Sequence, residues 1–125
     1  MSSVKILSGA SVFLVSSVTR SAEYYRDSLG FRFDRYWGEP PSFCMVWRDE
    51  QCIMLSQVED PEAIRPRGSI WDAYMWVDDV DALFKGFEAQ KATIVTEPSM
   101  KPYGVKEGVI QDPDGYEICF GQGME

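Results

Sequence analysis

The sequence contains no histidine, and only three of its 125 residues are cysteines. Without imidazole the usual activator of a catalytic cysteine is missing, and metal sites built on histidine are excluded. The cysteines are Cys44, Cys52 and Cys119; none forms a CxxC pair, and each lies in an apolar, strand-like run. We therefore expect reduced thiols packed in a core, and a cytoplasmic protein.

Long apolar runs and clusters of positive charge are also missing. The apolar stretch near the N-terminus is interrupted by Ser8, Gly9 and Ser11, so it predicts a strand over 8–15 rather than a signal peptide or a membrane span. The 12 basic residues are scattered among 20 acidic ones, which gives a net charge of −8. Because phosphate binding needs a concentrated positive face, we expect neither nucleic acid nor a membrane as partner.

What the sequence does contain is one order of elements that occurs twice. After the strand at 8–15, apolar residues recur at helical spacing from Val18 to Leu29, and Gly30 ends the helix. Further strands are predicted over 31–37, 43–47 and 52–57. The second copy is predicted as a strand over 70–77, a helix from Val80, a strand near 93–96, and strands flanking the Asp-Pro-Asp-Gly turn at 112–115. The chain therefore predicts two β-α-β-β-β modules.

The two copies align residue by residue at their ends. Segment 15–18 matches 77–80, and segment 53–57 matches 118–122, with the longer turn in the second copy absorbing the shift between them. Ser17 and Asp79 are equivalent in this alignment, and both are predicted helix N-caps. A chance likeness is disfavoured because order, spacing and capping positions agree. We expect one domain over 1–125, with module 1 at about 6–57, a linker at about 58–69 and module 2 at about 70–122.

Two local motifs carry a resemblance to a known family. Segment 20–25, Arg-Ser-Ala-Glu-Tyr-Tyr, with 28–31 after it, resembles the first helix of the vicinal-oxygen-chelate superfamily, which includes glyoxalases and bleomycin-resistance proteins. Segment 112–118 is similar to that family's closing hairpin. The resemblance implies an α+β fold in which two tandem modules form a curved, cup-shaped mixed sheet with a helix outside each module. It also implies that a second chain completes the cup, so we expect a homodimer.

The resemblance further implies four metal-ligand positions on the inner strands, where metal-dependent members carry histidine, glutamate or glutamine. The matching positions hold Ala10, Met54, Asp72 and Cys119. Alanine has no donor atom, and a thioether is a poor ligand for the hard and borderline ions of this chemistry. The remaining two donors are fewer than the three protein ligands of an ordinary catalytic site. We therefore expect a member that has lost the metal site and uses no cofactor.

Strand alternation predicts which side chains share the inner face of the cup with those four positions. On the fifth strand these are Asp72, Tyr74 and Trp76. The predicted ligand-binding residues are Met54, Asp72, Tyr74, Trp76, Cys119, Trp47, Phe43 and Tyr103. For most of the aromatic residues, and for Met54, a role in the core is the competing interpretation.

Four functional hypotheses follow. The leading one is a metal-independent binding protein of the bleomycin-resistance type, which sequesters a small aromatic or cationic compound in an aromatic-lined cup and so gives antibiotic resistance. The second is a lyase or isomerase of the same fold that works without metal, with Asp72 as candidate general base and Tyr74 or Tyr103 polarising a carbonyl. The third is a divalent-metal site in a shifted strand register, drawing on Glu23, Asp34, Glu39, Asp112 and Glu117. The fourth is a structural protein whose own side chains fill the cup.

Overall fold

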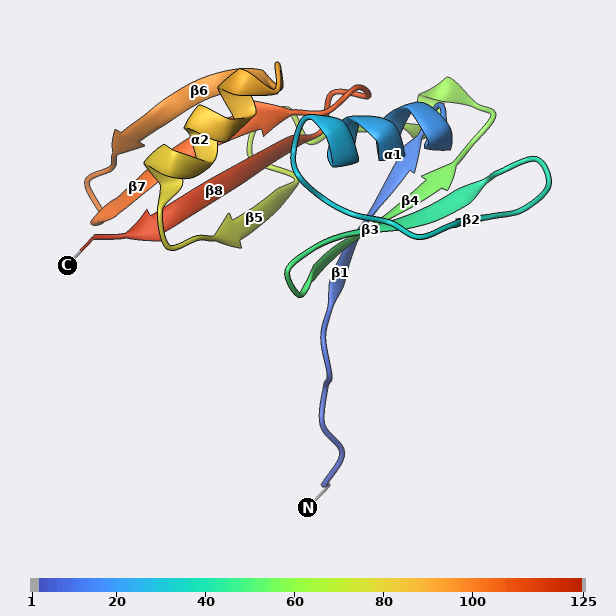
Figure 1. Cartoon of the computed structure of the whole chain (residues 1–125), viewed down its shortest axis with the longest axis horizontal. Helices are drawn as coiled ribbons and strands as arrows, with labels where there is room; N and C mark the ends of the chain where they lie inside the picture. The colour runs from blue at the N-terminus through green and yellow to red at the C-terminus, as the bar shows by residue number, and fades with distance from the viewer. Residues whose placement is uncertain (1–2, 125) are drawn as a thin grey trace.

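The computed structural model describes residues 3–124 and shows two four-stranded sheets side by side, with one helix on the same side of each (Figure 1). Module 1 consists of β1 (Ala10–Val15), α1 (Val18–Asp27), β2 (Tyr36–Trp37), β3 (Phe43–Arg48) and β4 (Gln51–Gln57). Module 2 consists of β5 (Ala73–Trp76), α2 (Val80–Ala89), β6 (Thr93–Met100), β7 (Val105–Gln111) and β8 (Glu117–Gly123), and the short 3-10 helix η1 (Pro61–Ala63) lies between the modules. The predicted α+β fold of two βαβββ modules is confirmed.

Both sheets have the same topology. The strand order is β1-β4-β3-β2 in the first sheet and β5-β8-β7-β6 in the second. In each, the first strand pairs in parallel with the last, while the other neighbours pair antiparallel. A parallel pair needs a long crossover, and the helix with the next two strands supplies it.

The two helices begin with the caps that the alignment predicts. Ser17 Oγ accepts a hydrogen bond from the backbone N–H of Arg20 at 3.2 Å, and Asp79 Oδ1 accepts one from Ala82 at 3.0 Å. Each side chain thus satisfies one backbone donor that a helix N-terminus leaves free.

A pair of equivalent glutamines at the ends of β4 and β8 satisfies a second donor of each helix. Gln57 Oε1 accepts from the N–H of Val18 at 2.8 Å, and Gln122 Oε1 accepts from the N–H of Val80 at 2.9 Å. The matching segments 53–57 and 118–122 therefore play the same part in their modules: in each, the last strand fixes the start of the helix that packs on it.

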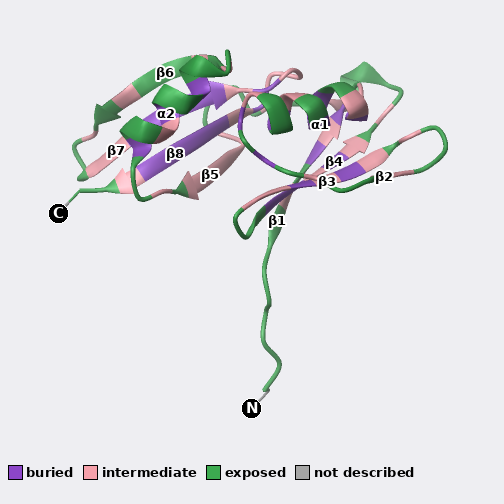
Figure 2. Ribbon diagram, in the orientation of Figure 1, coloured by how far each residue is buried: buried purple, intermediate pink, exposed green. Residues whose placement is uncertain are grey.

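The hydrophobic core lies between the helices and the sheets (Figure 2). In module 2 the rings of Phe84 and Phe87 on α2 meet Phe120 on β8, with Phe87 and Phe120 centroids 5.3 Å apart. Gly108 on β7 faces the Phe84 ring so closely that a Cβ there would lie 2.6 Å from it. The helix-facing side of each sheet is therefore buried, and the opposite side, called the inner face below, is left for other contacts.

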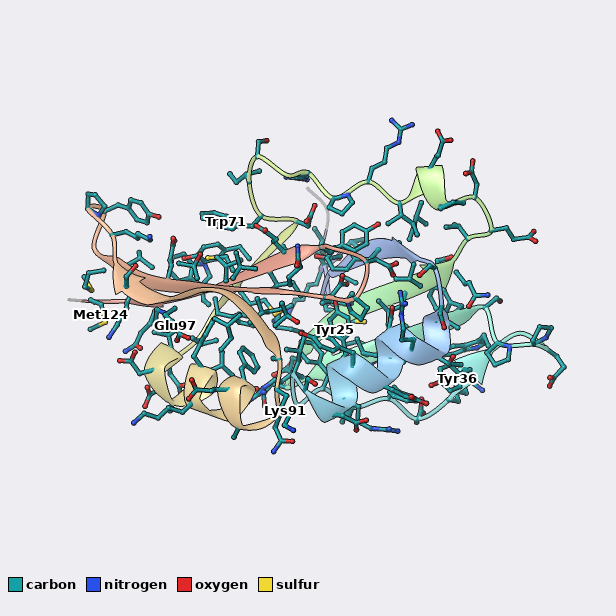
Figure 3. All side chains as sticks on the ribbon, turned by 90° about the horizontal axis from the view of Figure 1, so that it is seen from above. Tyr25, Tyr36, Trp71, Lys91, Glu97 and Met124 are labelled. Atoms are coloured by element: carbon teal, nitrogen blue, oxygen red, sulfur yellow. The ribbon has the colours of Figure 1, made fainter. Side chains whose placement is uncertain are left out.

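The turn between β7 and β8 joins the two modules. The Tyr25 hydroxyl on α1, near the centre of Figure 3, donates to the buried Asp112 carboxylate at 2.8 Å. The Tyr116 ring stacks on Phe13 of β1 at 4.3 Å, and its hydroxyl donates to the carbonyl of Leu14 at 2.7 Å. The predicted Asp-Pro-Asp-Gly turn thus also anchors module 2 to module 1.

The predicted strand over 31–37 is wrong for most of its length. Only Tyr36–Trp37 form a strand, and Arg32 makes an isolated bridge to Trp47. At the start of the segment the N–H of Phe31 bonds the carbonyl of Tyr25 at 2.9 Å and caps α1 instead of pairing with β3.

The chain before β1 extends away from the rest of the molecule as an arm, defined here as residues 3–9 (Figure 1). Ile6 and Leu7 on this arm are 95% and 93% exposed. Among the described residues no helix is long and apolar enough to cross a membrane, since α1 and α2 have ten residues each.

Candidate functional site

The inner face of module 2 brings together aromatic, thiol and carboxyl side chains from three neighbouring strands. Tyr74 and Trp76 project from β5, and Cys119 lies opposite Tyr74 on the neighbouring strand β8. Glu107 comes from β7, where it is paired with Gly121 of β8. Because side chains alternate across a strand, these residues share the face that points away from α2.

Glu107 is the centre of a hydrogen-bonded group that we call the tyrosine–glutamate cluster: Tyr74, Tyr103 and Glu107. Tyr74 donates its hydroxyl proton to Glu107 Oε2 at 2.8 Å, and Tyr103 donates its own to Oε1 at 2.7 Å. Glu107 is only 3% exposed, whereas Tyr103 is 61% exposed. The cluster therefore runs from a buried carboxylate to a hydroxyl at the surface.

The cluster changes the acidity of its tyrosines. The hydrogen bond to Glu107 is the main reason why the pKa of Tyr103 rises to about 12. Burial, followed by the same carboxylate, raises the pKa of Tyr74 well above its usual value. Both phenols consequently keep their protons at neutral pH and act as donors toward Glu107.

Gly121 makes room for this arrangement. A Cβ at position 121 would overlap the Tyr74 hydroxyl, so only glycine lets the Tyr74 ring lie across β8 and reach Glu107. The β7–β8 and β5–β8 pairings thus bring three strands together at one polar group.

Aromatic rings continue the face beside the cluster. The centroids of Trp71 and Tyr74 are 5.0 Å apart, and those of Tyr74 and Trp76 are 4.9 Å apart. Trp76, at the end of this row, is 67% exposed. Figure 3 shows Trp71 and Glu97 on opposite sides of the sheet, so the aromatic row lies on the side away from α2. Neighbouring rings are inclined to one another by 59° and 60°, which are edge-on and tilted contacts typical of aromatic clusters.

Two hollows flank β5 where the modules meet. One, of about 290 Å³, is lined by Met75 and Trp76 of β5, by the β3–β4 turn at 48–51, and by Leu83 of α2 with Phe120, so it lies on the α2 side of the sheet. The other, of about 310 Å³, is lined by Tyr74 together with the start of β1 and Cys52. Both lie at the small end of the size range of sites for small molecules.

The comparison with known families decides the relationship. A sequence model of the glyoxalase/bleomycin resistance protein/dioxygenase superfamily matches residues 9–120. The chain belongs to this superfamily. A search of curated protein sequences found no match.

Several solved structures share the fold. The bleomycin-binding protein from bleomycin-producing Streptomyces verticillus, complexed with copper(II)-bleomycin, is 23% identical with a TM-score of 0.71, and 98% of each chain is covered. A glyoxalase-related enzyme from Clostridium phytofermentans is 16% identical with a TM-score of 0.78, again with 98% of each chain covered. TioX from Micromonospora sp. ML1 is 19% identical with a TM-score of 0.74, covering 92% of this chain and 97% of that one. At these identities the likeness establishes the fold alone.

The four metal-ligand positions expected for the superfamily do not fit a metal in this member. Ala10 offers no donor atom and Met54 only a thioether. Burial raises the pKa of the Cys119 thiol to about 12, whereas a metal ligand must be a thiolate. Among residues 3–124 no three aspartate, glutamate or cysteine side chains are grouped so that they could hold an ion, and the carboxylates of the shifted-register hypothesis form no such group.

Asp72, the candidate general base, lies one residue before β5 and is engaged with the backbone. Its Oδ1 accepts from the N–H of Arg67 at 2.8 Å, and its Oδ2 accepts from the N–H of Glu117 at 2.9 Å. These bonds fix the end of the inter-module linker on β8. They engage one lone pair on each oxygen and hold the carboxylate against the backbone.

Three predicted ligand-binding residues lie on the inner face of module 1 instead. Met54 on β4 pairs with Met45, while Trp47 and Phe43 on β3 pair with Cys52 and Ser56. They share this face with each other and lie on a different sheet from the tyrosine–glutamate cluster. The structure therefore brings together Tyr74, Trp76, Tyr103 and Cys119, and places the other four predicted residues elsewhere.

Glu107 was missed by the sequence reasoning although it is the central polar group. One signal was present: in the strand 105–111, Glu107 alternates with Gly108 and Ile110 and falls on the same face as Val105 and Val109. A lone carboxylate in an apolar row is unusual because burying a charge is costly. Its tyrosine partners, however, are distant in sequence or lie in a loop.

Proposed function

We propose that this protein is a metal-independent small-molecule-binding protein that holds an aromatic or cationic compound against the aromatic row of module 2. The observation that carries the proposal is Trp76, a large ring that is 67% exposed at the end of the aromatic row and in contact with Tyr74. Trp rings are costly to leave in water, so an exposed one in contact with further aromatic rings points to a ligand or partner.

Two further observations favour binding over catalysis. The Asp72 carboxylate is used for backbone hydrogen bonds, and the raised pKa of Cys119 keeps it a poor nucleophile. In addition, a structural neighbour in the superfamily is a bleomycin-binding protein. Sequestration of a toxic compound in this way would give antibiotic resistance, and the three free, buried cysteines are compatible with the reducing cytoplasm.

We also propose that the working unit is a homodimer, in which a second copy packs on the arm and on the inner face of module 1 and leaves the aromatic row of module 2 accessible. The arm at residues 3–9 carries Ile6 and Leu7 away from its own chain, almost fully exposed. The inner face of module 1 exposes Val12 as well. An extended arm and an open apolar face on one chain are complementary if two copies exchange them, as a two-fold symmetric interface requires.

Binding is tested by titrating the protein with copper(II)-bleomycin, the compound bound by the structural neighbour, and with metal-free bleomycin, using native mass spectrometry. Trp76→Ala is expected to weaken retention of a bound compound at least about tenfold, as loss of an aromatic anchor does. Trp37→Ala is the matched control, because Trp37 lies in module 1 with Arg35 over its ring. If Trp76→Ala and Trp37→Ala behave alike toward every retained compound, the aromatic row is not the site.

The dimer is tested by light scattering behind size exclusion. The wild-type chain is expected at twice its mass of 14.2 kDa, and Ile6→Asp with Leu7→Asp is expected to shift it toward the monomer. Glu59→Lys, an exposed change in the inter-module linker, is the control. A wild-type monomer at about 100 μM would contradict the proposal, because a stable dimer interface is saturated at that concentration.

A further inference from the structure

The Glu107 carboxylate of the tyrosine–glutamate cluster is buried and makes no direct ion pair among the described residues; the nearest cation that the electrostatics indicate is Lys101, which acts on the neighbouring Cys119. The Glu107 carboxylate is 3% exposed, and the ion pairs of residues 3–124 are Arg20–Asp114, Arg26–Asp27 and Lys106–Asp81, none of which includes it. The neighbouring Lys106 points to the other side of the sheet and bonds Asp81 on α2 at 2.7 Å. A buried carboxylate is costly unless it is paired and hydrogen-bonded, and the direct partners of Glu107 are two neutral hydroxyls rather than a cation.

The hydrogen bonds also fix what the cluster can offer to a ligand. A tyrosine hydroxyl has one proton and two acceptor lone pairs. Tyr74 and Tyr103 both give that proton to Glu107, so each phenol oxygen is left as an acceptor with a carboxylate behind it. Such a surface attracts N–H donors, most strongly charged ones, and repels anions.

The aromatic row beside the cluster suits the same kind of ligand. Within the described residues, two rings already carry a guanidinium: Phe33 under Arg26 and Trp37 under Arg35, at 5.4 and 4.3 Å. Trp76 carries none and is exposed. An exposed indole face next to a buried anion is the combination that binds organic cations. The net charge of −8 adds a long-range attraction for positive ligands.

We infer that the tyrosine–glutamate cluster is a recognition site for a cationic nitrogen that carries N–H groups, such as an amidinium, a guanidinium or a protonated amine, borne on an aromatic group that lies on Trp76. This inference rests on the proposed function, because it assigns the ligand class at the same face. The nitrogen donates to the Tyr74 and Tyr103 oxygens, and Glu107 supplies the opposing charge through them.

The test uses three probes of one shape: benzamidinium, benzamide and benzoate, which are cationic, neutral and anionic. Binding is followed by chemical-shift changes of the tryptophan indole N–H groups up to about 10 mM, a range that detects millimolar affinities. We expect the wild-type protein to bind benzamidinium about tenfold more tightly than benzamide, and to bind benzoate least, since a charge-assisted hydrogen bond is roughly twice as strong as a neutral one.

Three variants locate the effect. Glu107→Gln removes the charge and keeps the shape, and is expected to abolish the tenfold preference for benzamidinium while leaving benzamide binding unchanged. Glu97→Gln makes the same change in net charge on the α2 side of the sheet, and is expected to keep the preference. Tyr103→Phe removes one exposed acceptor without disturbing the core, and is expected to weaken benzamidinium binding several-fold.

The outcomes separate the two proposals. Equal binding of benzamidinium and benzamide by the wild-type protein, with both lost in Trp76→Ala, would overturn the cation inference and leave the aromatic site standing. A preference retained by Glu107→Gln and Tyr103→Phe would mean that the cluster is purely structural. No shift of the Trp76 indole with any probe would overturn the proposed function and the inference together.

Discussion

Adding one methyl group at Gly121 should displace the Tyr74 ring and so break its hydrogen bond to Glu107 on the inner face of module 2. In Gly121→Ala the new Cβ overlaps the Tyr74 hydroxyl and crowds the rest of its ring, so Tyr74 must rotate away from Glu107. Overpacking of this kind costs about 1–3 kcal/mol, and the loss of a hydrogen bond to a buried charge costs about 1.5–3 kcal/mol. Because relaxation of the ring relieves part of the first cost, we expect unfolding free energy to fall by about 2–4 kcal/mol.

The measurement is denaturant unfolding of Gly121→Ala beside Gly123→Ala. The control lies two residues along the same strand, and a Cβ there meets nothing within 4 Å. It therefore carries the usual backbone effect of replacing glycine without the overlap. For a chain of this size, 2–4 kcal/mol corresponds to a melting temperature lower by roughly 8–16 °C.

A double-mutant cycle identifies the cause. In a Tyr74→Ala background the overlap is gone, so Gly121→Ala is expected to cost no more than Gly123→Ala. The reasoning is refuted if Gly121→Ala is as stable as Gly123→Ala in the wild-type background, or if its full cost persists after Tyr74 has been removed.

Three other expectations follow from the titration shifts and the module junction. Burial raises the pKa of Asp112 to about 6, against its hydrogen bonds from Tyr25, Asp114 and Tyr116. The folded pKa lies above the unfolded value of about 3.9, so the native state binds the proton more tightly than the unfolded chain between these two values. The free energy of unfolding is therefore expected to fall by about 2–3 kcal/mol as pH rises from 4 to 6.5. Asp112→Asn should remove this pH dependence. Cys119, with its pKa raised to about 12, should resist iodoacetamide at pH 8 in the folded protein and react at once in denaturant; rapid labelling of the native chain would contradict its burial. We also expect the two modules to unfold in one transition, as a single domain does, with coincident far-ultraviolet circular dichroism and tryptophan fluorescence curves; separated midpoints would show that the junction at Asp112 and Tyr116 is too weak to couple them.

The tandem fold could be predicted because its signals are local. Helix periodicity, the caps at Ser17 and Asp79, and the turn at 112–115 each depend on neighbouring residues, and their repetition indicated two modules. The strand at 31–37 failed for an equally physical reason: the N–H of Phe31 had a better partner at the end of α1 than across the sheet. Extended propensity alone does not show which donors remain free to pair.

The candidate site, too, could be predicted only in part. Strand alternation alone placed Tyr74 and Trp76 on one face, because a period of two is a property of the strand itself. The grouping of Tyr74 and Tyr103 around Glu107 depends on the pairing of β5 with β8 and of β8 with β7, and on the space left by Gly121. The sequence by itself determined the two modules, their caps and the faces of their strands. Only the tertiary structure decided that a carboxylate on β7 lies buried beneath two tyrosines, because strand register is set by packing of the whole sheet and not by any one segment.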